Sequence, residues 1–308
     1  MINLLFWLLV SWFCVGLIFR TTAKNIGAPW NGIGAIVNNL KGVSKAPMQY
    51  RMLQAWFVKF VARATGLKKL ELLDVNGRLV VRYVFATMLA LAFALWAAQL
   101  YFNNLLYTII LLVLLLSTTV YDYMDKYFEL GFFALCFYGI STGQIWIAMI
   151  ATVLGSFNKE SSLLQVAIPL VIPFTAIFTQ IISSFILMIC WLVPYLLLRK
   201  RYGVRESYVP AVIEYATGNK SPLLFGFFAT TWPLNRKFFR ELNKINDTIW
   251  NSLILIALSL LSLFINPTYL IFVASYLILI TLTGSLREPR IYNSLALIFI
   301  PVLMRLII

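Results

Sequence analysis

The chain has 308 residues, of which 61% are hydrophobic, 16% are aromatic and only 12% are charged. Because a soluble domain carries about 25% charged residues, this composition indicates an integral membrane protein. The sequence contains no histidine, which excludes a histidine general base and any histidine-based metal centre. The three cysteines, Cys14, Cys136 and Cys190, lie in apolar runs and are expected to be buried hydrophobic residues.

The formal net charge is +14, but the basic residues flank apolar runs. In that position they would meet lipid headgroups, so we expect membrane lipids as partners and no nucleic acid.

The first candidate span covers residues 4–19. We expect a retained anchor, because no basic residue precedes it and no small-residue cleavage site follows. A long polar loop at 20–82 comes next, followed by expected spans at 84–102 and 105–120.

Two longer apolar stretches follow. Residues 130–157 are interrupted around 139–143, which predicts two short helices that meet there, with one tilted span as the alternative. Residues 163–198 are too long for one crossing, and Pro169 and Pro173 give the chain places to turn.

After a second long polar loop at 199–247, spans are expected at 249–265, at 269–282 and from 292 to the end. We therefore predict a single all-α transmembrane domain, residues 1–308, with about ten helices (eight to ten) in the plasma (inner) membrane. Both termini are then on the same side.

With ten spans, both long loops lie on one membrane face, which we call the charged face. Every Lys and Arg except Arg305, and all 11 acidic residues, fall on it. The excess of Lys and Arg favours a cytoplasmic location for this face.

The first long loop contains an amphipathic segment between Pro47 and Gly66. One side carries Leu53, Trp56, Phe57, Phe60 and Ala64, and the other carries Arg51, Lys59 and Arg63. This spacing predicts an interfacial helix. It serves as a headgroup anchor in one interpretation, and in the other Arg51 binds a phosphate.

Acidic residues gather before the 130–157 stretch, at Asp122, Asp125 and Glu129. Carboxylates so close together could bind a divalent cation or act as a base, and the alternative is a solvated connector. Two further charged elements, Asn158-Lys159-Glu160-Ser161 and Arg287-Glu288-Pro289-Arg290, lie between apolar runs. Charges at membrane depth usually face protein or a water-filled cavity, although both elements could be simple loops or anchors.

These elements occur together, in this order, in a set of bacterial polytopic proteins. Residues 46–53, Ala-Pro-Met-Gln-Tyr-Arg-Met-Leu, resemble their "APxQYRxL" signature, and residues 158–161 resemble their "NKET" element, with Ser161 in place of Thr. Glu288 and Arg290 are similar to a final "E-x-R". Those proteins resemble the GT-C glycosyltransferase superfamily, which implies a GT-C-like fold.

The resemblance also implies transfer of a sugar from a polyprenyl-phosphate carrier to an acceptor hydroxyl or amide. The implied catalytic residues are Asp122, Asp125 and Glu160. The carrier phosphate would be held by Arg51, Lys159, Arg287 and Arg290, with Gln49, Tyr50, Asn158 and Glu288 in support. No cofactor follows from the sequence beyond a divalent cation at the carboxylates.

Two other functions remain open. A scaffold or accessory subunit of a membrane protein complex fits the absence of any acidic residue between Arg20 and Leu70. A lipid or small-solute transporter is the third, although it would normally place more polar groups within the spans.

Overall fold

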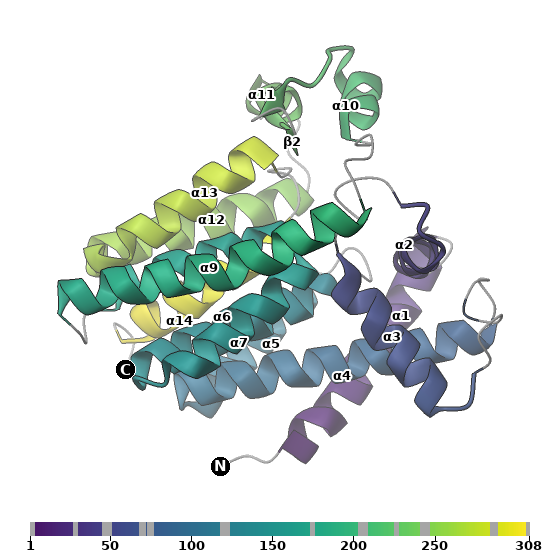
Figure 1. The fold of residues 1–308 in the computed structure, drawn as a ribbon, viewed down its shortest axis with the longest axis horizontal. Coiled ribbons are helices and arrows are strands. Elements are labelled where there is room, and N and C mark those ends of the chain that lie inside the picture. Colours follow the sequence, from purple (N-terminus) through teal and green to yellow (C-terminus); the bar gives the residue numbers. More distant parts are fainter. Residues whose placement is uncertain are drawn as a thin grey trace.

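In the computed structural model, the chain folds almost entirely into helices (Figure 1). The structure describes residues 4–26, 30–44, 51–67, 72, 77–117, 124–172, 176–202, 209–224, 228–240, 247–283 and 289–305. The N-terminal half contains α1 (Leu4–Ile26), α2 (Trp30–Lys41), α3 (Met52–Ala64), α4 (Gly77–Phe102), α5 (Leu105–Ser117), α6 (Asp125–Ser141) and α7 (Ile145–Asn158).

The C-terminal half begins with the 3-10 helix η3 (Glu160–Ala167), α8 (Ile168–Val171), α9 (Ile177–Tyr202) and α10 (Val209–Thr217). A short antiparallel pair, β1 (Leu223–Leu224) and β2 (Phe228–Ala229), precedes α11 (Trp232–Arg240). The chain continues with α12 (Asp247–Ile265), η5 (Pro267–Tyr269), α13 (Leu270–Thr283), η6 (Pro289–Leu295) and α14 (Ala296–Met304).

Among the described helices, α4 and α9 are long and apolar enough to cross a membrane, with 26 residues each. At a rise of about 1.5 Å per residue, each extends about 39 Å, whereas the hydrocarbon core is about 30 Å thick. The apolar segments of the other helices, such as Leu4–Phe19 within α1 and Trp250–Ile265 within α12, are shorter, between 10 and 17 residues.

The interruptions predicted from the sequence are present as helix ends. Residues 130–157 belong to two helices, α6 and α7, which confirms the expected break there. Gly143 lies in this turn with a φ of 72°, a conformation that favours glycine because it has no Cβ. The 163–198 stretch is likewise divided, since α8 ends at Val171 and α9 begins at Ile177.

The structure corrects the expected start of two helices. α4 begins at Gly77 rather than near residue 84, and α6 begins at Asp125 rather than near residue 130. Asp125 and Glu129 are therefore part of a helix and are only 7% and 4% exposed, so they do not form the solvated connector that was one alternative.

The core is centred on the packing of α4 against α6. The α4 residues Ala86, Ala90, Ala94, Ala97 and Ala98 are fully buried. Small side chains allow helix backbones to approach closely. On α6, Gly131 faces Phe93 so tightly that an added Cβ would clash with the phenyl ring.

The predicted amphipathic helix is present as α3, and it has a third, buried face. Ala55, Val58 and Ala62 pack inward on that side, where α3 contacts α2, α4 and α7. Phe60 on the aromatic side is 68% exposed, as expected for an interfacial helix. Figure 1 shows α2 and α3, like α10 and α11, at one end of the bundle of longer helices. The two long polar loops of the sequence thus contribute helices to the same end of the fold.

Candidate functional site

Two carboxylates on the first turns of α6 are the starting point of the candidate site. Asp125 and Glu129 are four residues apart, so they lie on the same face of the helix, one turn from each other. Both are buried. A buried carboxylate is costly unless a cation or hydrogen-bond donors accompany it, so each of them requires a partner.

The first partner comes from the loop before α3. Arg51 Nη1 lies 3.3 Å from Asp125 Oδ2, and the two side chains are 14% and 11% exposed. The backbone carbonyl of Arg51 accepts a hydrogen bond of 3.2 Å from the Asn39 side chain on α2. Helices α2 and α6 therefore both fix the position of Arg51.

The second partner comes from the junction between α7 and η3. Lys159 Nζ lies 2.7 Å from Glu129 Oε2, and the Ser161 hydroxyl donates a hydrogen bond to the other carboxylate oxygen of Glu129. Lys159 has an extended backbone (φ −162°, ψ 147°), which ends α7 and separates it from η3. This break allows Lys159 and Ser161, two residues apart in the chain, to contact the same carboxylate.

Asn158 connects the two halves of the site. Its amide nitrogen donates a 2.8 Å hydrogen bond to the backbone carbonyl of Asp125, and the residue is 1% exposed. We refer to Arg51, Asp125, Glu129, Lys159 and Ser161, together with Asn158, as the charged cluster. Its two ion pairs join segments that are 74 and 30 residues apart in the chain.

The cluster contains four of the residues proposed from the sequence: Arg51, Asp125, Asn158 and Lys159. Glu160 is the first residue of η3, and Arg290 lies within η6. The side chains of both residues are outside the described part of the structure. The other proposed residues, Gln49, Tyr50, Asp122, Arg287 and Glu288, lie outside the described residues altogether. Helix η6, which begins at Pro289, packs against α6.

Two members of the cluster had no assigned role in the implied reaction, although Glu129 was among the carboxylates that could bind a cation or act as a base and Ser161 belonged to the NKES element. Glu129 is the partner of Lys159, and Ser161 supports it. Glu129 is four residues after Asp125, a spacing that puts both carboxylates on one face of a helix. The sequence could have indicated this only if the helix had been expected to start at Asp125. A third cation, Lys126, is 4% exposed, with its ammonium 4.8 Å from the centre of the Tyr127 ring.

Within the described ranges, no group of three or more Cys, Asp or Glu side chains is arranged to hold a metal ion. Asp122 is outside those ranges, so the divalent cation expected there stays a prediction. Two cavities of about 600 Å³ and 470 Å³ occur elsewhere in the fold, and no residue of the charged cluster lines either of them.

The cluster offers two kinds of chemistry. Its arginine and lysine can hold a phosphate, and its carboxylates can orient those cations or accept a proton. Comparisons with known protein families, with curated proteins and with solved structures find no match to this chain.

Proposed function

We propose that this protein is a GT-C-like membrane glycosyltransferase that uses a polyprenyl-phosphate-linked sugar as donor and carries its reaction centre at the charged cluster. One observation carries the proposal. The three sequence elements that resemble the GT-C proteins supply the cations and carboxylates that meet on α6: the APxQYRxL segment, the acidic segment and the NKES element.

We also propose about ten membrane crossings, which requires the shorter apolar helices to act as spans alongside α4 and α9. The exposure of α9 supports a lipid environment. Ile177, Phe178, Ile181, Phe185 and Val193 are between 51% and 74% exposed along one helix. A water-soluble protein rarely exposes so large an apolar surface, whereas lipid chains would cover it at no cost.

The reaction breaks the bond between the sugar C1 and the carrier phosphate oxygen and forms a bond from C1 to the acceptor. The departing phosphate gains negative charge, which Arg51 and Lys159 are placed to stabilise. Asp125, or Asp122 or Glu160, takes the proton that the acceptor loses. Glu129 holds Lys159 in position before the phosphate arrives.

The proposal is tested with membranes from cells that express the protein, supplied with a panel of radiolabelled polyprenyl-phosphate-linked sugars. Asp125→Asn keeps the shape of the side chain but removes its charge, and we expect transfer to fall by about 100-fold or more. Glu160→Gln should have a similar effect. Glu214→Gln, on the exposed face of α10, is the matched control. Normal transfer by Asp125→Asn, or no transfer by the unaltered protein with any donor, would contradict the proposal.

A scaffold subunit is the second candidate, and a specific observation favours it. Both carboxylates of the cluster are engaged in ion pairs, and neither cavity opens onto the cluster. The charge-exchanged variant Arg51→Asp/Asp125→Arg separates the two functions. A purely structural pair should tolerate the exchange and retain its membrane partner, whereas a reaction centre should lose sugar transfer even if the protein folds.

A further inference from the structure

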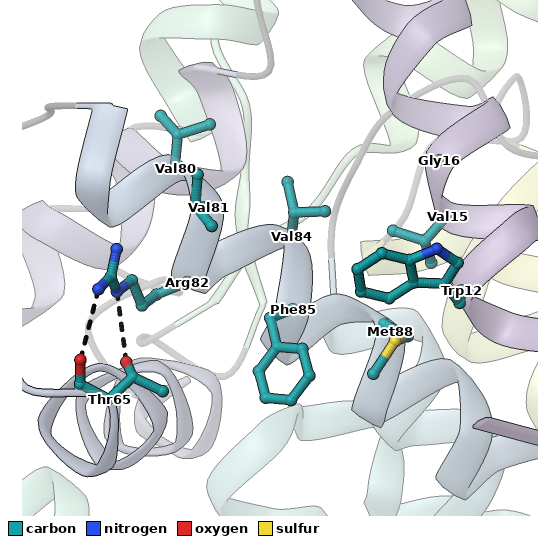
Figure 2. Close-up of a pocket in the computed structure, with 10 residues that line it drawn as sticks. All are labelled: Trp12, Val15, Gly16, Thr65, Val80, Val81, Arg82, Val84, Phe85 and Met88. Carbon is teal, nitrogen blue, oxygen red and sulfur yellow. Dashed lines mark hydrogen bonds between the residues drawn. The ribbon is translucent and has the colours of Figure 1, made fainter. Parts of the chain in front are cut away.

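A groove of about 600 Å³ runs between α1 and α4, far along the chain from the carboxylates of α6. Its walls are almost entirely apolar and come from Trp12, Val15 and Gly16 on α1 and from Val80, Val81, Val84, Phe85 and Met88 on α4 (Figure 2). A volume between about 300 and 1,000 Å³ is typical of sites for small molecules.

The groove is open at its rim and closed at its base. Val15 and Met88 are 1% and 6% exposed, whereas Trp12 and Val81 are more than 60% exposed. Gly16 leaves part of the wall without a side chain, and a Cβ placed there would have no neighbour within 4 Å. The space beside Gly16 is therefore large enough for an added group.

One end of the groove carries a cation. Arg82 Nε donates a hydrogen bond of 3.3 Å to the Thr65 hydroxyl, and Nη2 donates one of 3.4 Å to the Thr65 carbonyl (Figure 2). Its third bond, from Nη1 to the Arg78 carbonyl, is 3.2 Å long. All three acceptors are uncharged, and among the described residues no carboxylate pairs with Arg82.

Further positive charge lies close to this end. Arg78 is one turn before Arg82 on α4, and Arg63 is in the last turn of α3, two residues before Thr65. An apolar groove that ends at Arg82 complements an amphiphile with an acyl chain and a negatively charged head.

The phosphate of the proposed sugar carrier cannot be this head while it also reacts at the charged cluster. Arg51 immediately precedes α3, and Thr65 immediately follows it. A helix of 13 residues separates the two points by about 20 Å. A single phosphate group cannot contact both ends, so the groove is separate from the charged cluster.

We propose that the groove between α1 and α4 binds one anionic phospholipid of the surrounding membrane, with an acyl chain against Gly16 and Met88 and the phosphate on Arg82. The bound lipid fills the space between α1 and α4 and neutralises Arg82. It is a stably held component of the folded protein and takes no part in sugar transfer.

The test is native mass spectrometry of the full chain, purified in detergent and incubated with equal amounts of phosphatidylglycerol and phosphatidylcholine of the same acyl chains. The unaltered protein should retain one phosphatidylglycerol in preference to phosphatidylcholine by about fivefold or more, the factor expected for one basic residue beside a headgroup of net negative charge, because choline offsets the phosphate of phosphatidylcholine. Arg82→Gln should abolish that preference, and Gly16→Leu should remove the bound lipid of either kind.

Gly34→Leu is the matched control for the added side chain. A Cβ at Gly34 on α2 also has no neighbour within 4 Å, and this residue does not line the groove. It should bind phosphatidylglycerol like the unaltered protein. Circular dichroism and size-exclusion chromatography check that each variant is folded, and Arg82→Gln, which adds no bulk, provides an independent test if Gly16→Leu misfolds.

Full lipid retention by folded Gly16→Leu, or equal binding of both phospholipids by the unaltered protein, would overturn the proposal. So would displacement of phosphatidylglycerol from the unaltered protein by an equal amount of polyprenyl phosphate, together with loss of polyprenyl phosphate binding in Gly16→Leu. The groove would then be a site for the carrier lipid.

Discussion

The ion pair between Lys159 and Glu129 gives the sharpest test of the charged cluster. We consider Lys159→Met, which keeps a long apolar side chain but removes the ammonium 2.7 Å from Glu129. Glu129 is only 4% exposed and would then keep the hydrogen bond from the Ser161 hydroxyl but no cation beside it. Removing one partner of a buried ion pair costs about 3–5 kcal/mol, because the other charge is left without compensation.

Glu129→Gln is the second variant of a double-mutant cycle, and it leaves Lys159 without its carboxylate partner. Because the Lys159 side chain is 17% exposed, its ammonium can move toward water more easily than the Glu129 carboxylate can. We therefore expect a smaller cost than for Lys159→Met. In the double variant Lys159→Met/Glu129→Gln no uncompensated charge remains, so it should be more stable than Lys159→Met alone.

The free energy of unfolding is measured for all four proteins in the same detergent, by titration with a denaturant and detection by circular dichroism. We expect the free energy of unfolding to be lowest for Lys159→Met, and higher for both Glu129→Gln and the double variant. If Lys159→Met lost less than about 1 kcal/mol, as is usual for exposed pairs, the carboxylate of Glu129 would not be buried and paired as the structure has it.

Three further predictions concern the packing of α4 against α6, the positioning of Arg51 and the membrane topology. Gly131→Ala should lower the free energy of unfolding by about 1–3 kcal/mol, because the added Cβ would collide with Phe93 in the tight contact between α4 and α6. The double variant Gly131→Ala/Phe93→Leu should recover part of this loss, and the same titration measures both. Asn39→Leu removes the hydrogen bond to the Arg51 carbonyl and should leave Arg51 less firmly positioned. Sugar transfer should therefore fall, although the charged groups are unchanged. Transfer equal to that of the unaltered protein would contradict this role for Asn39. In a protein without its three native cysteines, single cysteines at the exposed positions Lys220 and Thr268 should react with a membrane-impermeant thiol reagent from opposite sides of the membrane, and labelling of both from one side would refute the ten-span topology.

The sequence was most informative about helices and their ends. The runs of apolar residues predicted α5, α12 and α13 within a few residues, because in a lipid environment the backbone has to form its hydrogen bonds within each segment. Breaks were equally readable where glycine or proline occurs, as at Gly143. Helix starts were less predictable when charged residues begin the helix, as in α6, because a local sequence pattern does not show whether a charge has a buried partner.

The site was predictable only in part, for a related reason. Arg51, Asp125, Asn158 and Lys159 could be selected from short motifs, yet no motif states which cation pairs with which carboxylate. The pairing of Lys159 with Glu129 depends on the extended backbone at Lys159 and on the packing of α6 against α7. Both arise from contacts between residues far apart in the chain.

The sequence by itself determined the chemical character of this protein: an apolar helical chain, without histidine, whose charges gather between apolar runs. These are properties of residue type and order, which local hydropathy and helix geometry convert directly into structure. The tertiary structure alone decided that Asp125 and Glu129 are buried and paired, and that α1 and α4 leave a groove ending at Arg82. Burial, ion pairing and cavities depend on how helices pack against one another, and this is set by side chains that the sequence separates by tens of residues.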